Sequence, residues 1–342
     1  YSDVKRRSFW KKNEKNFKFN FIFFKKFILN KNKFDIVPLP SIQSIKQIFS
    51  LKPKIIICTG FSFSTLISSI YSKLYNVPFL IWTGENEYSK VNILRHLLRK
   101  FLINRAHSMF TYGSASSNFY QKRYNVDFNK MLKIYNIIPI NHNINVQKNI
   151  SNKISLLNEH KLKLIFVGEL IEKKGVDLLF NTMTEVHKIL DAYKLSFTII
   201  GHGDLKNNLK KEFSKVDFEL EFFENLPNED VLKLIAQNHF FIFPSRREPW
   251  GHVILESMSV GTPVLTSKYP GAVQDIIHPS NNSYIVDFKK PVLVAKKIKD
   301  SISDIQGYQE FCLNSYSSFD KFQKIMVKNP RLIFNHIKNI IS

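Results

Sequence analysis

The stretch that most constrains this chain is Phe240–Thr266, where two apolar runs flank a polar loop and an amphipathic segment. The first run, Phe240–Phe243, is followed by the loop Arg246-Arg-Glu-Pro-Trp-Gly251. The next segment places apolar residues at helical spacing and predicts a helix that Gly261 ends. These apolar positions are Val253, Ile254, Leu255 and Met258. The pattern therefore predicts strand, loop, helix and strand, a βαβ unit with a polar tip.

Two glutamates, Glu248 and Glu256, stand on either side of this tip. At the carboxyl end of a parallel strand, the next helix points its free N–H groups and its positive dipole end at the crevice, which favours an anion. We expect Gly251 to let such a ligand approach the main chain. An ionised glutamate only accepts hydrogen bonds, and its two oxygens suit the vicinal diol of a ribose or a sugar. Diphosphate between two diols describes a nucleotide sugar.

Three motifs in this order resemble one enzyme family. The run from Glu248 to Glu256 is similar to the E-x7-E signature of the retaining glycosyltransferases of family four, which have the GT-B fold. Upstream, Leu164–Leu179 resembles that family's strand, glycine loop and Lys-Gly helix start, and Ile199–Leu205 resembles its next strand and Gly-x-Gly turn. Any one motif alone is a weak signal, but the three in order, over about the C-terminal half, are specific.

The resemblance implies an α/β GT-B architecture, with two facing Rossmann-like domains, parallel sheets and a C-terminal helix that crosses back to the N-terminal domain. We expect an acceptor-side domain over 1–145, a nucleotide-sugar-binding domain over 156–328 and the crossover helix over 329–342. Asn141–Ser155, rich in Asn and Lys, is the expected linker. Residues 1–35 hold no strand with a glycine-bearing turn, so we expect the first strand of the N-terminal domain to be missing or divergent.

The resemblance also implies roles for site residues. We expect Glu248 to bind the sugar and Lys174 the diphosphate, both as catalytic residues, and Glu256 to bind the ribose. The family usually has an arginine where this chain has Glu169, so either Arg246 or Arg247 substitutes or donor binding is weaker. The remaining donor-binding candidates are Trp250, Gly251, His252, Val253, Ile254, Gly201, Gly203 and Asn225. For His252 a structural role stays open, as does a plain turn for the two glycines.

The acceptor side is less defined. Thr83-Gly-Glu-Asn-Glu87 follows a predicted buried strand and so lies at a crevice edge. Relatives often carry a histidine in this region, whereas this chain has Gly84 and Glu85. We expect Glu85, Glu87 and Gly60 on the acceptor side, with a carboxylate binding acceptor hydroxyls or acting as a base. The alternative is that these loop carboxylates are only solvated.

The charge is unevenly distributed. The net charge is +22, of which residues 1–150 contribute +19 through 25 Lys+Arg against 6 Asp+Glu, and residues 151–342 the remaining +3. Such a basic half fits an anionic membrane surface or an anionic acceptor better than nucleic acid, for which no recognised module is present. A merely solvated basic face is the alternative. We expect a cytoplasmic protein, peripheral on the inner face of the membrane, whose two distant cysteines are reduced and structural.

The chain contains no Asp-x-Asp, and its His and Cys residues lack ligand spacing, so we expect neither a metal nor another cofactor. The predicted reaction is metal-independent, retaining transfer of a sugar from a nucleotide-diphosphate sugar to a glycan or lipid-linked glycan, as in polysaccharide, lipopolysaccharide or O-antigen biosynthesis. Two alternatives remain. One is a GT-B-like epimerase or phosphorylase, and the other is a catalytically inactive subunit that binds the nucleotide sugar.

Overall fold

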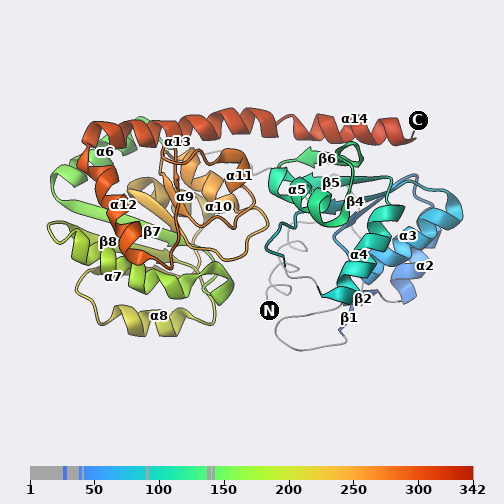
Figure 1. Ribbon diagram of the computed structural model, residues 1–342, viewed down its shortest axis with the longest axis horizontal. Helices are drawn as coiled ribbons and strands as arrows, with labels where there is room; N and C mark the ends of the chain where they lie inside the picture. The colour runs from blue at the N-terminus through green and yellow to red at the C-terminus, as the bar shows by residue number, and fades with distance from the viewer. Residues whose placement is uncertain are drawn as a thin grey trace.

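The computed structural model describes residues 26–28, 38–40, 42–89, 92–136, 140 and 143–341. The expectation of a missing or divergent opening over residues 1–35 falls almost wholly outside this part of the chain. Two domains lie side by side, each built on a parallel sheet, and a pair of helices at the C-terminal end of the chain runs across both (Figure 1). The predicted α/β class with two parallel sheets is confirmed.

The N-terminal domain has a four-stranded parallel sheet in the order β3-β4-β5-β6. Its strands are β3 (Ile56–Thr59), β4 (Phe79–Thr83), β5 (Ser108–Tyr112) and β6 (Met131–Ile134). Its helices are α2 (Ile42–Leu51), α3 (Phe63–Tyr75), α4 (Ile93–Arg105) and α5 (Gly113–Tyr124). Two short strands, β1 (Lys26–Ile28) and β2 (Pro38–Pro40), form a separate antiparallel pair. Ser62 starts α3 with a capping box, in which its side chain accepts from the N–H of Thr65.

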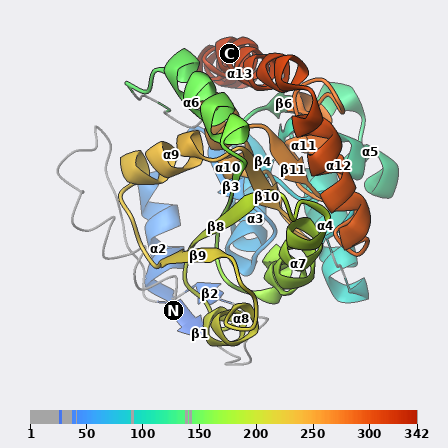
Figure 2. The same ribbon diagram turned by 90° about the vertical axis from the view of Figure 1, so that its left-hand side faces the viewer.

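The C-terminal domain has a six-stranded parallel sheet in the order β12-β11-β10-β7-β8-β9. Its strands are β7 (Lys161–Val167), β8 (Lys194–Ile200), β9 (Glu219–Phe223), β10 (Phe240–Phe243), β11 (Val264–Thr266) and β12 (Tyr284–Ile285). The helices around it are α7 (Leu179–Ile189), α8 (Lys206–Phe213), α9 (Asn228–Gln237), α10 (His252–Ser259), α11 (Val273–Ile276) and α12 (Pro291–Ser303). Helices cover both faces of this sheet (Figures 1 and 2).

Successive side chains of the buried strand β10 point into two different hydrophobic clusters. Phe240 and Ile242 of β10 pack in a cluster with α7, α8 and α12, whereas Phe241 and Phe243 pack in a second cluster with α9 and α10. Because successive side chains of a strand point to opposite faces, an all-apolar strand such as β10 needs cover on both sides. The four apolar residues therefore fix β10 in the middle of the sheet and its carboxyl end between two helical layers.

The expected linker over Asn141–Ser155 is wrong for most of its length, because helix α6 (Val146–Asn158) begins within it. The side chain of Asn145 accepts from the N–H of Lys148 and caps the helix. Ile150 and Leu157 are buried against the C-terminal core, and the ammonium of the fully buried Lys153 donates to the Gly261 carbonyl at 2.7 Å. The Asn- and Lys-rich composition conceals a helix in which Ile150 and Leu157, two turns apart, are buried in the core.

The last two helices join the domains. In α13 (Ile305–Met326), four of the five aromatic residues are buried, namely Tyr308, Phe311, Phe319 and Phe322, whereas Tyr316 is exposed. Helix α14 (Asn329–Ile341) then lies against the N-terminal sheet, where Ile333, Ile337 and Ile340 pack on Leu80, Phe110 and Ile134. His336 adds a hydrogen bond to Ser108 at 2.7 Å. The chain thus returns to the N-terminal domain as expected (Figure 1).

Candidate functional site

The amino terminus of α10 is an open hydrogen-bond donor. The helix covers His252–Ser259, as predicted, and Gly251 stands at its cap position without a side chain to cap it. The N–H of Ile254 donates to the carbonyl of Gly251 at 3.0 Å. The N–H groups of His252 and Val253 have no acceptor among the described residues, as the first turn of a helix leaves them. This end of α10 therefore offers two main-chain donors and the positive end of the helix dipole.

Gly251 is required by the turn that aims this helix. Its φ is 99°, in the left-handed region. A Cβ there would lie 3.3 Å from the side chains of both Ile254 and Pro270. A larger residue would therefore strain the backbone and push on two neighbours. The backbone turn thus requires a glycine at position 251, in addition to the predicted role of Gly251 in letting a ligand approach the main chain.

Lys174 and Glu248 form an ion pair in front of the α10 terminus. Lys174 ends the short 3-10 helix η3 (Glu172–Lys174), and the next residue, Gly175, lies against β10 so closely that a Cβ would sit 2.1 Å from the carbonyl oxygen of Pro244. This contact brings the two loops together. Both side chains of the pair are only 15 to 16% exposed. Lys174, predicted to reach a diphosphate as a free charge, is thus paired with the other predicted catalytic residue.

More cations surround this pair. Burial lowers the pKa of Lys173, although the nearby Glu248 opposes that shift. Arg247 lies close enough to lower it further. Among the described residues, neither the Lys173 ammonium nor the Arg247 guanidinium has a hydrogen-bond or ion-pair partner. The site therefore holds unneutralised positive charge beside an open helix terminus.

Arg246, one of two predicted substitutes for the family's arginine, faces elsewhere. Its guanidinium makes a two-pronged ion pair with Asp177, at 2.5 and 2.6 Å, and donates to the carbonyl of Glu172 at 2.9 Å. These bonds hold the loop after β7, and Arg246 also lines a cavity of about 530 Å³ together with Tyr88 and Tyr269. A donor-binding role for Arg246 stays a prediction, whereas the guanidinium of Arg247 has no partner among the described residues. Glu169, which replaces the family's arginine, is exposed.

His252 connects the helix terminus to the N-terminal domain. The amide Nδ2 of Asn136 donates to its Nε2 at 2.8 Å, so the neutral ring carries its proton on Nδ1. That Nδ1 is buried and without a partner in the described structure. Burial is also the main reason why the pKa of His252 is lowered. A neutral imidazole with one orphaned donor suits a ligand oxygen.

Glu256 lies one turn further along α10 and is half-buried. Its carboxylate has no hydrogen-bond or ion-pair partner in the described part of the chain. Burial raises its pKa. An acid in this state lacks the hydrogen-bond donors that would favour its ionised form, and ligand hydroxyls would supply them.

Trp250 and Ile254 were predicted to bind the donor, but both side chains lie in the core. Trp250 is 2% exposed and stacks on Phe322 of α13, with ring centroids 6.1 Å apart. It also packs against Tyr135 of the N-terminal domain, at 5.9 Å. Ile254 is fully buried in the second cluster. The side chains of both residues therefore serve packing, and a donor-binding role for Trp250 and Ile254 stays a prediction that rests on their main chain.

Gly201 and Gly203 serve close packing of two loops. A Cβ at Gly201 would lie 1.9 Å from the carbonyl oxygen of Gly168, and one at Gly203 would lie 2.4 Å from that of Leu170. The two glycines therefore let the loop after β8 contact the loop after β7. Asn225 is exposed in the loop after β9. The structure brings none of these three into contact with the α10 terminus.

Asn86 was not predicted, yet it joins the two halves of the site. Its buried side-chain amide donates to the carbonyls of Glu248 and Tyr269, each at 3.0 Å. Ser114 adds a second cross-domain contact, donating to Asp275 through its N–H at 2.8 Å and its hydroxyl at 2.6 Å. The sequence signal for Asn86 was its place in a polar loop directly after a buried strand. Within that loop, the predicted site residues are the two glutamates, Glu85 and Glu87.

Glu85 does not face an acceptor. Its carboxylate pairs with Arg99 at 2.5 Å and accepts from the hydroxyl of Tyr120 at 3.3 Å. Both of its oxygens are thus used inside the N-terminal domain, and the role predicted for it is not supported. At Gly84, a Cβ would lie 2.0 Å from the Tyr112 ring.

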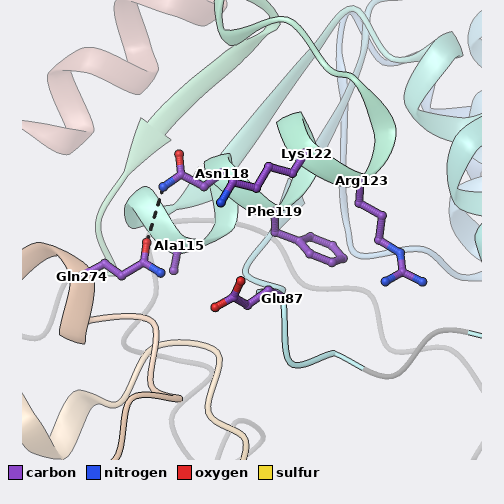
Figure 3. A pocket seen from close by; sticks show the side chains of 7 residues that line it. All are labelled: Glu87, Ala115, Asn118, Phe119, Lys122, Arg123 and Gln274. Carbon is purple, nitrogen blue, oxygen red and sulfur yellow. Dashed lines mark hydrogen bonds between the residues drawn. The ribbon is translucent and has the colours of Figure 1, made fainter. Parts of the chain in front are cut away.

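Glu87 is exposed and lines a cavity of about 250 Å³ between the domains (Figure 3). The other lining residues are Ala115, Asn118, Phe119, Lys122 and Arg123 of α5, and Gln274 of α11. Asn118 and Gln274 are joined across this cavity by a hydrogen bond of 3.5 Å. Gly60, the third acceptor-side candidate, has a φ of 70° and open space where a Cβ would lie. Glu87 and Gly60 thus remain accessible.

The described residues contain no group of three or more His, Cys, Asp or Glu side chains placed to hold a metal ion. Among the helices of that same part of the chain, none is both long and apolar enough to cross a membrane.

Residues 147–316 match the family model of the glycosyl transferases group 1. The C-terminal domain is therefore similar to the glycosyl transferases group 1 over most of its length. An uncharacterized glycosyltransferase of Methanocaldococcus jannaschii, MJ1607, is 29% identical over 199 residues, which are 56% of this chain and 50% of that protein. The capsular polysaccharide biosynthesis glycosyltransferase CapM of Staphylococcus aureus is 22% identical over 219 residues, 62% of this chain and 50% of CapM. The matched region thus spans about half the length of these relatives.

The two-domain arrangement has solved counterparts. The crystal structure of Anabaena Alr3699/HepE in complex with UDP and glucose is similar with a TM-score of 0.70 and 16% identity, covering 86% of this chain and 82% of that one. At this identity the likeness shows the fold alone, which is GT-B. The glycosyltransferase domain thus supplies α10, Glu248, Glu256 and Lys174, and the N-terminal domain completes the site through Asn86 and Asn136.

Proposed function

We propose that this protein is a retaining, metal-independent glycosyltransferase that moves a sugar from a nucleotide-diphosphate sugar to a hydroxyl of a glycan or lipid-linked glycan. One observation carries the proposal: the open end of α10 lies beside an unpartnered carboxylate, Glu256, and the Glu248–Lys174 pair. A diphosphate flanked by two hydroxyl-bearing rings satisfies all of these groups at once.

The diphosphate is the part that the helix terminus binds. The N–H groups of His252 and Val253 donate to its oxygens, and the buried Nδ1–H of His252 adds a third donor. Lys173 and Arg247 neutralise its charge, and the diphosphate in turn favours the charged form of Lys173, whose pKa burial lowers. Glu256 accepts from the ribose hydroxyls, and the site needs no cation other than these side chains.

The chemistry follows from where charge develops. The bond between the sugar C1 and the diphosphate oxygen breaks, and the acceptor oxygen forms its bond to C1 on the same face. The acceptor proton passes to the departing diphosphate, so no enzyme nucleophile is needed. Lys174 and the α10 N–H groups stabilise the negative charge on the leaving group. Glu248 holds hydroxyls of the transferred sugar, while Lys174 fixes its orientation.

The N-terminal domain supplies the acceptor side. Glu87 and Gly60 are its accessible candidates, and the basic excess of residues 1–150 suits an acceptor that carries negative charge. We propose a lipid-linked acceptor at the cytoplasmic face of the membrane.

A panel of nucleotide-diphosphate sugars tests the proposal. We expect one of them to raise the melting temperature, since a ligand at about 100 times its dissociation constant adds roughly 2.7 kcal/mol of stability. With an acceptor present, the product should keep the anomeric configuration of the donor by NMR. Inversion would contradict the retaining mechanism, and turnover only with free phosphate would instead indicate a phosphorylase. Conversion of the donor sugar without an acceptor would indicate an epimerase, and binding without turnover an inactive subunit.

A further inference from the structure

Helix α4 carries large apolar side chains on its solvent side. Ile93, Leu94, Leu97 and Phe101 recur at helical spacing on one face and are 80, 74, 57 and 46% exposed. The opposite face is buried through Leu102 and Ile103, so α4 already packs on its own domain. A helix that is apolar on its outer face as well marks a surface that binds something.

Helix α3 extends this surface. Phe63, Ile70 and Leu74 lie on one face of α3 and are exposed. Arg105 joins the two helices, since its guanidinium lies over the Phe101 ring, 5.3 Å from the centroid, and donates to the carbonyl of Ser69 at 2.8 Å. These seven exposed residues of α3 and α4 form the α3–α4 apolar surface. The two helices lie side by side, and α5 rather than either of them faces the C-terminal domain (Figure 1).

The charge around the α3–α4 apolar surface indicates which class of partner it binds. Residues 42–105 contain nine Lys+Arg and only two Asp+Glu, and both acids, Glu85 and Glu87, lie in the loop after β4. Lys73 and Lys100 are exposed on the two helices themselves. Two copies of this chain docked through the same surface would bring like charges together, whereas anionic lipid headgroups would neutralise them.

We infer that the α3–α4 apolar surface docks on an anionic membrane, with its apolar side chains at the boundary between headgroups and acyl chains and its lysines on the headgroups. The inference rests on the proposed function for its purpose, because it would hold the enzyme beside a lipid-linked acceptor. Membrane docking itself needs neither donor nor turnover.

Vesicle flotation of the full chain tests the inference. Wild-type protein should float with phosphatidylcholine vesicles that contain phosphatidylglycerol, and less so with phosphatidylcholine alone or at high salt. The double variant I93S/L94S should bind these vesicles at least about tenfold more weakly because two exposed apolar anchors are lost. L293S is the matched control, since Leu293 is equally apolar and 56% exposed but lies on α12.

A charge variant separates the electrostatic part. K73E/K100E should lose more than about twentyfold in vesicle affinity, because each basic residue near an anionic surface contributes about fivefold. K299E, on the exposed side of α12, should bind as wild type does. The inference would be overturned if wild-type protein floated equally with and without anionic lipid. It would also be overturned if the controls L293S and K299E lost as much vesicle affinity as the variants of α3 and α4.

Two further measurements are decisive. If light scattering shows a wild-type dimer that I93S/L94S dissociates, the surface binds a second copy and not a membrane. Donor-induced thermal shift, measured on the same variants, distinguishes the two proposals. A variant that no longer floats but still binds a nucleotide sugar supports both proposals. Wild-type protein that floats but binds none of the panel would leave the membrane surface standing without the proposed enzyme function.

Discussion

The side-chain amide of Asn86, in the N-terminal domain, donates a 3.0 Å hydrogen bond to the main-chain carbonyl of Glu248, in the C-terminal domain. The same amide bonds the carbonyl of Tyr269. Loop 84–89 and the loop that carries Glu248 are thus tied together by one buried side chain. One domain cannot move relative to the other unless these bonds break or the two loops move together. The position of Glu248 therefore depends on both domains.

Asn86→Ala should lower turnover about tenfold while donor affinity stays within about twofold, because Glu248 loses its support but the α10 terminus does not. Leaving two buried carbonyls without this donor should also cost about 1–3 kcal/mol of unfolding free energy. Asn118→Ala is the control, since Asn118 also faces the C-terminal domain but through a single 3.5 Å bond. Equal kinetic effects of the two changes would remove Asn86 from the site.

Glu256→Gln should weaken donor binding about tenfold to a hundredfold, the effect of losing hydrogen bonds to a charged group. The wild-type affinity should also depend on pH. Because the pKa of Glu256 is raised above 4.5 and ribose hydroxyls favour its ionised form, binding releases a proton and tightens as pH rises from 4.5 through the raised pKa. Calorimetry should show this slope in wild type and its loss in the variant. An unchanged slope would refute the assignment.

Lys174 and Glu248 should behave as one unit. Either Lys174→Met or Glu248→Gln alone should lower turnover strongly, since each removes a catalytic group. Lys174→Met alone should also cost more stability than the double variant Lys174→Met/Glu248→Leu, because the single change leaves a largely buried charge unpaired. Urea unfolding of wild type, Lys174→Met, Glu248→Leu and their double variant gives the coupling. Additive stabilities would show that the pair contributes nothing to folding.

Trp250→Ala should destabilise the protein by about 3–5 kcal/mol, as for other buried tryptophans. Its ring packs between Tyr135 and Phe322 and has no exposed face to offer a ligand. Donor affinity of the folded protein should therefore change by less than about twofold. A large loss of donor affinity with little loss of stability would show instead that the Trp250 side chain binds the donor.

Stability should fall in acid because of His239. Its Nδ1 accepts from the N–H of Lys163 and its Nε2 bonds the carbonyl of Lys153, both at 2.9 Å. Burial is the main cause that lowers its pKa from 6.5 to about 3. The unfolded chain binds the proton first, so unfolding free energy should fall by about 1.4 kcal/mol per pH unit between pH 6.5 and 3. His239→Gln should flatten this part of the profile measured by urea unfolding.

Local pattern predicted the elements around the site well. The bounds of α10, the end of β10 and the position of Gly251 follow from apolar spacing and glycine, which act over a few residues. Helix α6 was missed because its Asn-rich sequence resembles a loop, and only packing of Ile150, Lys153 and Leu157 on the core reveals it.

Hydrogen bonds between residues of different domains could not be predicted from local sequence pattern. The bonds of Asn86 to Glu248 and of Asn136 to His252 join residues more than one hundred positions apart, and docking of the two domains sets them. The same docking buries Trp250, whose place in the sequence motif predicted a ligand contact. The ion pair of Arg246 with Asp177 could not be predicted either, because the two residues lie far apart in the sequence.

The packing of α14 on the N-terminal sheet has a consequence for synthesis on the ribosome. Leu80, Phe110 and Ile134 leave the ribosome long before Ile333 and Ile337, which cover them in the finished protein. Since domains otherwise fold in the order in which they emerge, the N-terminal domain has to keep an apolar sheet face uncovered until α14 has been made. The domain that is made first is therefore completed only after the whole C-terminal domain has emerged.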